Sequence, residues 1–346
     1  MSEKISLGLD IGTSVIKVIA LQKDGSSVRL AGVATRGVQS VGVQSESLID
    51  WERLAQEVKD TVKSVNIQSR FVHVSLPENQ VYTKVVEMPS LSDRELSSAI
   101  RWEAEQYIPI PLSEAVLDYQ LVTKAGESKQ GKMQVLLVAA PLTLIHKYQK
   151  IIGFANLSPL TFETDMLATI RALIKIGDMT PTFIIDTGTS TTNIAIVRFG
   201  VPVFSYSLNI GGNAITKAIA SDFGLDLARA EEYKRTYGFD DSALQGKLTE
   251  TITPVLNIII SEVKKGIEFY QERYPQEETL RRVIVSGGMA SLPKVSVFFT
   301  KNLGIEAEIA NPWSDISVDE KMFSQAQHIS PLFTVATGLA LRGLPE

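Results

Sequence analysis

Two stretches of this sequence place an aspartate at the end of an apolar run and follow it with a glycine and small hydroxyl residues. They are LGLDIGTSVIKVIAL, at 7–21, and FIIDTGTSTTNIAIV, at 183–197. The residues concerned are Asp10, Gly12, Thr13 and Ser14 in the first stretch and Asp186, Gly188, Thr189 and Ser190 in the second. Glycine allows a tight turn whose N–H groups approach an anion, and an aspartate at its edge can hold hydrated Mg²⁺. One such turn is common in ordinary hairpins, but two copies predict a site for Mg²⁺ and the polyphosphate of a nucleotide.

Two further glycine pairs stand near predicted strands. VIVSGGMASLP, at 283–293, is expected to be a buried strand and a turn at Gly287, Gly288 and Met289, where a flat ring can lie against bare backbone. GGNAITKAIASDFG is expected to open a helix at Gly211 and Gly212. Taken alone, the turn at Gly287 and Gly288 also fits an ordinary turn from a strand into a helix.

The bulk composition excludes several classes of function. The chain has 346 residues, 44% of them hydrophobic and 21% charged, with a net charge of -5 and no cysteine. Disulfides, thiolate metal sites and a cysteine nucleophile are excluded, and the charge gives no electrostatic case for nucleic acid. His73, His146 and His328 are scattered and form no triad with a serine. The N-terminus does not resemble a signal peptide, and the longest apolar run, 135–145, is too short to span a bilayer, so a cytoplasmic protein is expected.

The apolar pattern predicts the elements that must position these turns. Strands are expected at 5–10, 15–21, 28–33 and 71–76, with a helix capped by Asp50 before the last of them. The block 83–142 differs: a strand ends at Pro89, the capping box SDRE at 92–95 opens a helix to about 107, and two strands follow. The second half repeats strand, turn and strand, and then adds a long helix with Thr253 as its N-cap and Pro254 in its first turn.

This order indicates two α/β halves that face each other. The predicted first lobe is 1–180, with an inserted α+β subdomain at about 83–142. The predicted second lobe is 181–346, with a subdomain at about 211–280. The apolar segment at 330–344 is expected to form a final helix that returns to the region between the lobes.

The motifs together resemble those of the actin-like ATPase superfamily and come in the family's order. The two Asp-containing stretches match its phosphate motifs, and VIVSGGMASLPKV matches its adenosine motif. FETDMLATIRAL, at 162–173, resembles the first connecting helix, and SPLFTVATGLALRG resembles the second. The resemblance implies an α/β actin-like ATPase fold, with two RNase H-like lobes around a nucleotide cleft and a small inserted α+β subdomain. It also implies that Lys17 contacts phosphate, that Asp10, Asp165 and Asp186 lie by the metal, and that Asp165 or Glu163 orients a water.

Two segments narrow the resemblance to the FtsA-like and PilM-like group. The segment 208–238 resembles one in which an AExxK motif, here Ala230, Glu231 and Lys234, approaches the ribose. The spacing of that pair equally fits an ordinary surface ion pair. The inserted block, with WEAEQYIP followed by DYQ, resembles the small subdomain of the PilM family of type IV pilus assembly. The sequence ends at GLPE, without the C-terminal amphipathic helix expected of an FtsA.

Membership in this group would imply ATP and Mg²⁺ as ligands. It would imply a PilN-like single-span inner-membrane protein as partner, docked through its cytoplasmic N-terminal segment. The chain would then be cytoplasmic and peripheral at the inner membrane through that partner, with self-association left open. Nucleotide would set the lobe conformation with slow or no hydrolysis, so the chain would be at most a weak ATPase.

Three other functions share the predicted turns. A sugar or small-acid kinase on the same fold would need a substrate pocket with a general base in the first lobe, and the sequence has no dedicated substrate motif. An FtsA-like division protein would form filaments that sediment with ATP. A binding module with an inactive nucleotide site would fail to bind nucleotide.

Trp102 is the candidate partner-binding residue outside the turns. In the helix expected at 93–107, Leu96, Ile100, Ala104 and Tyr107 share a face. Trp102 lies about 200° from Ile100 at roughly 100° per residue. It either packs on the strands of its own subdomain or is an exposed aromatic anchor for a partner, the residue type often found at interface hot spots.

Overall fold

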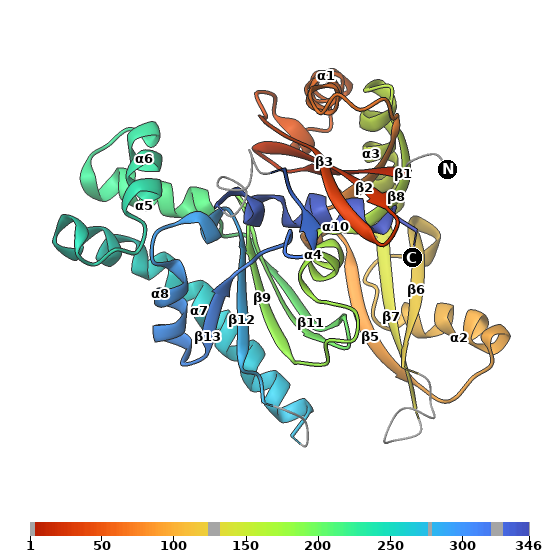
Figure 1. The fold of residues 1–346 in the computed structure, drawn as a ribbon. Helices are drawn as coiled ribbons and strands as arrows, with labels where there is room; N and C mark the ends of the chain where they lie inside the picture. The colour runs from red at the N-terminus through yellow and green to blue at the C-terminus, as the bar shows by residue number, and fades with distance from the viewer. Residues whose placement is uncertain (1–3, 124–131, 276–278, 320–327, 346) are drawn as a thin grey trace.

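The computed structural model describes residues 4–123, 132–275, 279–319 and 328–345, which form three β-sheets (Figure 1). A six-stranded sheet and a five-stranded sheet build two lobes, and a three-stranded sheet builds a small subdomain beside them. Short 3-10 helices connect several elements; they are η1 (Gly42–Gln44), η2 (Glu78–Gln80), η3 (Leu112–Glu114), η4 (Ala243–Gly246), η5 (Gly288–Ser291) and η6 (Ser330–Phe333). No helix among the described residues is long and apolar enough to cross a membrane.

The first lobe is a mixed sheet with helices on both faces. Its strands, in sheet order, are β14 (Ile316–Ser317), β3 (Ser27–Gly37), β2 (Val15–Asp24), β1 (Lys4–Ile11), β4 (Phe71–Leu76) and β8 (Ser158–Thr164). Its helices are α1 (Leu48–Ser64), α3 (Leu142–Phe154), α4 (Asp165–Leu173) and α10 (Thr334–Arg342). Side chains of α1 and α3 cover one face, and α10 covers the other. A sheet covered on both faces needs apolar residues on both sides of its strands, and β2 is buried along most of its length for that reason.

The second lobe repeats this plan. Its strands, in sheet order, are β11 (Val201–Leu208), β10 (Thr192–Arg198), β9 (Thr182–Thr187), β12 (Arg282–Gly287) and β13 (Glu306–Ile309). Its helices are α5 (Gly212–Phe223), α6 (Leu227–Tyr237), α7 (Lys247–Arg273) and α8 (Val295–Leu303). Side chains of α7 and α8 pack on one face of the sheet, and α4 packs on the other.

The two sheets share a strand topology. In each lobe the first three strands are antiparallel neighbours, and the fourth strand runs parallel to the first. The internal repeat predicted from the two Asp-containing stretches is therefore confirmed. α4 and α10 pack against each other between the sheets, in the centre of the molecule (Figure 1).

The small subdomain consists of three strands and one helix. They are β5 (Tyr82–Met88), β7 (Met133–Pro141) and β6 (Ala115–Thr123), in sheet order, and α2 (Asp93–Glu105). The predicted capping box is present, since the side chains and backbone of Ser92 and Glu95 bond reciprocally. α2 covers one face of the sheet, where Leu96, Ile100 and Ala104 are buried as expected.

Two aromatic residues of this subdomain are exposed, unlike the buried apolar residues of α2. Tyr107 was expected on the buried face, but its exposed fraction is 43%, because α2 ends at Glu105 and Ile108 takes the buried place. The ring of Tyr107 instead lies 4.9 Å from Lys84 Nζ. Trp102 is 68% exposed, so it does not pack on the strands of its own subdomain.

Two helix starts differ from the sequence prediction. The first helix begins at Leu48, with Ser47 at the N-cap position but without a capping hydrogen bond from its side chain, so Asp50 lies in the first turn. α7 begins at Lys247, not at Thr253 and Pro254, and contains that proline in its interior. An interior proline removes a backbone hydrogen bond and disfavours a helix. Here the buried side chains of Leu248 and Ile252 continue the apolar stripe of α7, and their packing outweighs that penalty.

Candidate functional site

The two glycine turns face each other across the lobes. In each turn the glycine N–H donates to the carbonyl three residues later: Gly12 to Val15 at 3.1 Å, and Gly188 to Thr191 at 2.9 Å. The hydroxyls of Thr13 and Ser190 lie 3.2 Å apart, so they join the turn of the first lobe to that of the second. The structure thus brings together the two stretches that the sequence singled out.

A lysine and an aspartate pair beside the first turn. The antiparallel register of β1 and β2 sets Asp10 opposite Lys17, and Lys17 Nζ donates to Asp10 Oδ2 at 2.8 Å. Burial alone would lower the pKa of Lys17, but the carboxylates of Asp10, Asp186 and Asp165 more than offset it, so the pKa of Lys17 lies above its ordinary value. A lysine that stays charged at this position can balance phosphate oxygens.

Asp165 and Asp186 lie in surroundings that disfavour the charged form of a carboxyl. Burial raises the pKa of the Asp165 carboxyl well above its ordinary value, and nearby carboxylates, of Asp10, Asp186 and Glu78, raise it further. A hydrogen bond with Ser75 opposes that rise. Burial also raises the pKa of Asp186, although Lys17 lowers it in part. Buried carboxylates of this kind gain from a nearby cation.

The N-terminus of α5 holds the second turn in place. The N–H groups of Gly212 and Asn213 donate to the carbonyls of Gly188 and Thr189 at 3.0 and 2.9 Å. Gly211 lies so close to the turn that a Cβ added there would stand 2.7 Å from each of these two carbonyl oxygens. The glycine pair predicted to open the helix is therefore also part of the packing of the turn.

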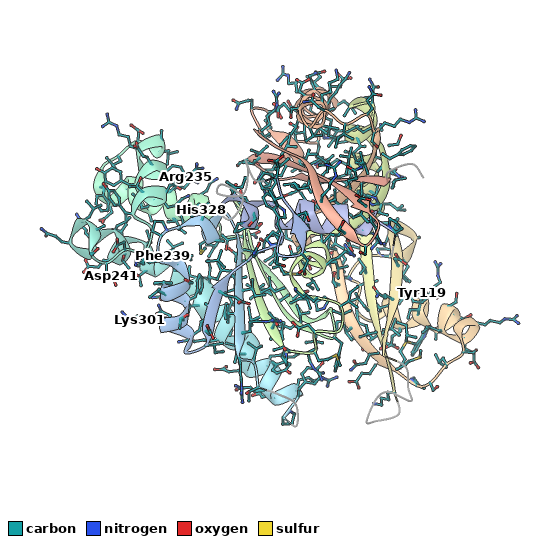
Figure 2. The ribbon with its side chains drawn as sticks, in the orientation of Figure 1. Tyr119, Arg235, Phe239, Asp241, Lys301 and His328 are labelled. Atoms are coloured by element: carbon teal, nitrogen blue, oxygen red, sulfur yellow. The ribbon has the colours of Figure 1, made fainter. Side chains whose placement is uncertain are left out.

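Glu231 and Lys234 link α6 to α5. Lys234 Nζ donates to Glu231 Oε2 at 2.6 Å, to Thr216 Oγ1 at 2.8 Å and to the Gly212 carbonyl at 3.1 Å. Lys234 is only 7% exposed, and burial lowers its pKa against the opposing effect of Glu231. The ion pair is therefore present but not fully solvated, because its lysine is buried against α5. Arg235 donates to the other oxygen of Glu231. Figure 2 shows Arg235 on the second lobe and Tyr119 of the small subdomain on the opposite side of the molecule.

The third turn lies beside the second. Gly287 pairs with Thr187 in the parallel register of β12 and β9, and its φ is 74°. A Cβ there would lie 2.4 Å from the Thr187 carbonyl oxygen, so both the conformation and the space require glycine. Gly288 continues the turn. The side chain of Met289, the next residue, is 3% exposed and packs in the core of the second lobe.

Glu163 differs from the three aspartates because its carboxylate is paired with arginines. Both of its oxygens accept from Arg171, at 2.5 Å, and Oε1 also accepts from Arg342 at 3.2 Å. The side chain of Glu163 is 4% exposed. Of the two acidic residues proposed to orient water, the arrangement favours Asp165.

Sequence reasoning missed several residues that support the aspartates. Hydrogen bonding by Ser75 opposes the rise in the pKa of Asp165, and hydrogen bonding by Ser286 does the same for Asp186. Ser286 Oγ also lies 2.9 Å from Thr334 Oγ1, which ties the end of β12 to the start of α10. Of these two serines, only Ser286 could have been noticed in the sequence, because it directly precedes the glycine turn at Gly287.

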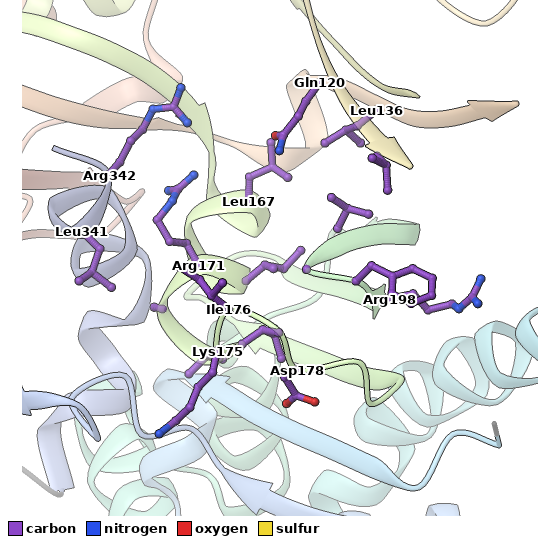
Figure 3. A pocket seen from close by; sticks show the side chains of 18 of the residues that line it. Gln120, Leu136, Leu167, Arg171, Lys175, Ile176, Asp178, Arg198, Leu341 and Arg342 are labelled. Atoms are coloured by element: carbon purple, nitrogen blue, oxygen red, sulfur yellow. The ribbon is translucent and has the colours of Figure 1, made fainter. Parts of the chain in front are cut away.

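A cavity of about 1870 Å³ lies elsewhere in the molecule. Asp10, Lys17, Asp165 and Asp186 are not among the residues that line it. Figure 3 shows Gln120 and Leu136 of the small sheet on one side, α4 with Leu167 and Arg171 beside them, and residues of the second lobe, such as Arg198, opposite. Ile176, in the loop after α4, also lines the cavity.

The two lobes, their repeated topology and the facing turns define a protein with the actin-like ATPase fold. Solved structures of that fold include an MreB of Spiroplasma citri bound to ADP, with a TM-score of 0.51, 14% identity and coverage of 97% of this chain and 94% of that chain. The sequence profile described as "Type IV pilus assembly protein PilM" matches residues 8–344. The chain belongs to the PilM family of type IV pilus assembly proteins.

Individual relatives agree with this placement. A solved structure described as a "PilM-PilN type IV pilus biogenesis complex" is 30% identical to this chain, has a TM-score of 0.84 and covers 99% of both chains. The cell division protein FtsA of Streptococcus pneumoniae is 24% identical over 88% of this chain and 75% of its own length. The resemblance read from the inserted block is therefore confirmed at the level of the family.

Proposed function

We propose that the chain binds Mg-ATP between its lobes and docks the cytoplasmic N-terminal segment of a PilN-like single-span inner-membrane protein. The proposed docking of a partner rests on the similarity to the PilM–PilN complex over 99% of both chains. In this proposal the chain is a cytoplasmic assembly protein that lies at the inner membrane through its partner. Bound nucleotide sets the relative position of the lobes, because a ligand favours the conformation that it binds more tightly.

The nucleotide half is supported by the geometry of the turns. Thr13 and Lys17 from the first lobe and Ser190 from the second present hydroxyl and ammonium donors around one place, while the N–H groups of Gly12 and Gly188 close the two turns. Glu231 and Lys234, and the Gly287 turn, would hold the ribose and the adenine. Phosphate oxygens bound by both turns would join the lobes directly.

The charge of the site fits a magnesium ion. Asp10, Asp165 and Asp186 supply three carboxylates, and Lys17 supplies one ammonium group. Among the described residues, no three carboxylate, imidazole or thiol groups could hold a metal ion directly. These aspartates would contact the water shell that Mg²⁺ commonly keeps in phosphate sites. Asp165 would also orient an attacking water, with hydrolysis slow or absent.

The cavity under the small sheet is the surface that we assign to the partner segment. Its volume of about 1870 Å³ exceeds the roughly 300–1,000 Å³ of ordinary small-molecule pockets. One wall is the face of the small sheet that α2 leaves uncovered, with Gln120 and Leu136, and another is α4. A chain of several residues in extended form would fit such a space, with apolar side chains against Leu136 and Leu167.

Capture from solubilised inner membrane tests the proposal as a whole. The purified chain should retain a small single-span protein through its cytoplasmic N-terminal segment, and a synthetic peptide of that segment should compete. Capture should differ between Mg-ATP and nucleotide-free conditions if lobe position and docking are linked. Failure to retain such a protein in either condition would overturn the proposed docking. Nucleotide binding is measured separately on the same preparation.

Replacement of Ile176 by aspartate should weaken capture at least tenfold. The side chain is fully exposed, at 106%, and lines the cavity, so the change places a charge where an apolar group of the partner would lie. Burying an uncompensated charge costs several kcal/mol, and 1.4 kcal/mol is about tenfold in affinity. Isothermal titration with the partner peptide measures the effect. Val297→Asp is the matched control: Val297 is 60% exposed on α8 and does not line the cavity. Equal affinity of both variants would place the segment elsewhere.

Trp102→Ala should weaken capture of the membrane protein and leave nucleotide affinity unchanged. Its exposed indole can anchor a partner, since large aromatic residues dominate many interfaces. α2 and the cavity lie on opposite faces of the small sheet, so this contact would be made outside the cavity. Phe154→Ala, at an exposed aromatic on α3, is the control. Full capture by the Trp102 variant would count against a partner contact there.

FtsA is a weaker second candidate, favoured by the similarity over 88% of this chain. An FtsA-like function predicts filaments that sediment with ATP. Sedimentation of the chain with and without Mg-ATP distinguishes the two, because a docking protein needs no filament.

A further inference from the structure

The two glycine turns are held by different parts of the chain. The N-terminus of α5 holds the second turn through the N–H groups of Gly212 and Asn213. The first turn contacts instead the segment 38–47, which joins β3 to α1 and contains η1. At the start of this segment, Val38 N–H donates to the Ser14 carbonyl at 2.9 Å. The segment 38–47 therefore supports the first turn as α5 supports the second.

A second contact with the first turn lies four residues further along the segment. Gly42 is buried, and its φ is 67°. A Cβ built there would lie 3.8 Å from the Thr13 carbonyl oxygen and 3.3 Å from Cγ1 of Val38. The segment thus lies against both hydroxyl residues of the turn, Thr13 and Ser14. A shift of its first residues must move the turn or leave the turn without this support.

Glu57, on α1, fixes the residues between these two contacts. Its Oε1 accepts from the N–H groups of both Gln39 and Ser40, each at 3.2 Å. Two successive backbone N–H groups that point at one oxygen form a favourable site for an anion. Oε2 of the same carboxylate is buried and has no hydrogen-bond partner among the described residues. Glu57 therefore holds the segment through a single oxygen.

The other end of the segment is held by side chains of α1 and α3. Trp51 Nε1 donates to the Ser45 carbonyl at 2.8 Å. Lys147 Nζ, on α3, donates to Glu46 Oε1 at 2.7 Å. This end is thus fixed independently of Glu57, and residues 39 and 40 are the part that Glu57 controls.

We propose that Glu57 is a positioning residue for nucleotide binding: it holds the segment 38–47 against the first turn and so keeps that turn where it meets phosphate. The inference rests on the proposed nucleotide site. Glu57 would touch neither the nucleotide nor the metal, and it would act through the backbone of the segment. Because the hydroxyl of Thr13 lies 3.2 Å from that of Ser190, a displaced first turn would also weaken this contact between the lobes.

Glu57→Ala should bind Mg-ATP about three- to tenfold more weakly. A hydrogen bond to a carboxylate is worth about tenfold or more, and only part of the loss of two such bonds reaches the nucleotide. Glu57→Gln keeps an accepting oxygen and should bind within about twofold of the native chain. Asp60→Ala is the matched control, because Asp60 lies on the same helix and accepts from Gln56 Nε2 within that helix at 2.9 Å. Titration of a fluorescent ATP analogue with Mg²⁺ measures all three variants.

Hydrogen exchange without nucleotide separates positioning from a general loss of stability. The amides of Val38 and Gly12, which donate to the carbonyls of Ser14 and Val15, should exchange faster in Glu57→Ala than in the native chain. The amide of Gly188, at the matching place in the second turn, should be unchanged because α5 holds that turn. Equally faster exchange at Gly188 would show that Glu57 acts on overall stability, and it would overturn the inference.

Gly42→Ala tests the same support from the other end. Alanine is strained at the positive φ of this position, so the segment should shift and Mg-ATP binding should weaken about as much as in Glu57→Ala. Gly25→Ala is the control: its φ is 57°, no atom lies within 4 Å of its Cβ, and its affinity should be native. Native affinity in both Glu57→Ala and Gly42→Ala would overturn the inference. If the native chain binds no Mg-ATP, the proposed nucleotide site fails, and the exchange of the Val38 and Gly12 amides alone decides whether Glu57 holds the turn.

Discussion

Replacement of Gly338 by alanine should lower the free energy of unfolding by about 3 kcal/mol or more, the upper part of the range for overpacked cores. A Cβ at this position would lie 1.8 Å from the carbonyl oxygen of Ala168 and 2.5 Å from its carbon. Both obstacles are backbone atoms of α4, which cannot move aside as a flexible side chain does. Urea or thermal denaturation of the variant measures the loss.

The control is Gly153→Ala on α3. No atom lies within 4 Å of a Cβ built at Gly153, so alanine fits and brings its better helix propensity. That variant should be as stable as the native chain or more stable by up to about 1 kcal/mol. If the two variants unfold at the same denaturant concentration, α4 and α10 do not pack as closely as the structure has them.

Close packing of these two helices matters because each extends from the proposed nucleotide site to the cavity. α4 begins at Asp165 and carries Arg171, which lines the cavity and donates to the Gly338 carbonyl of α10 at 3.2 Å. α10 begins at Thr334, bonded to Ser286 beside Asp186, and ends at Arg342 in the cavity wall. A Gly338 variant that still folds should therefore also alter any linkage between nucleotide and partner.

The turns could be predicted because their chemistry is local in sequence. Asp10 and Asp186 are each followed by a glycine two residues later. The capping box of Ser92 and Glu95 spans only four residues. Such patterns need no knowledge of distant packing. The family could be named for the same reason, since the inserted block is one continuous segment.

The rest of the site could not be predicted from local patterns, because residues that are distant in sequence determine its contacts. Glu163 was named beside Asp165 because both lie in the segment that resembles the first connecting helix, yet Arg342, far along the chain, accounts for part of the bonding of Glu163. Met289 was assigned with its glycine neighbours, and its side chain is buried in the core of the second lobe.

Replacement of Gly211 by alanine should weaken Mg-ATP binding by about tenfold to a hundredfold, since forcing a methyl into packed backbone typically costs 1–3 kcal/mol. A Cβ there would stand 2.7 Å from the carbonyl oxygens of both Gly188 and Thr189 and 2.8 Å from the Ser190 carbonyl carbon. α5 and the second phosphate turn must then separate. Because the Gly212 and Asn213 N–H groups hold that turn, the separation also weakens their hydrogen bonds. Titration of a fluorescent ATP analogue with Mg²⁺ measures the loss, and thermal denaturation checks that the variant is folded.

The neighbouring glycine provides the sharpest control for this prediction. A Cβ at Gly212 would meet Lys234 Nζ at 3.3 Å, the end of a flexible side chain, and the Gly188 carbonyl oxygen only at 3.7 Å. Gly212→Ala should therefore keep its affinity within about threefold, an energy below 1 kcal/mol. A loss confined to Gly211→Ala would place the nucleotide phosphates at the turn of Gly188 to Ser190. Equal affinities for both variants would mean that ATP, if bound, does not depend on this turn, and the phosphate site would have to lie with the first lobe alone.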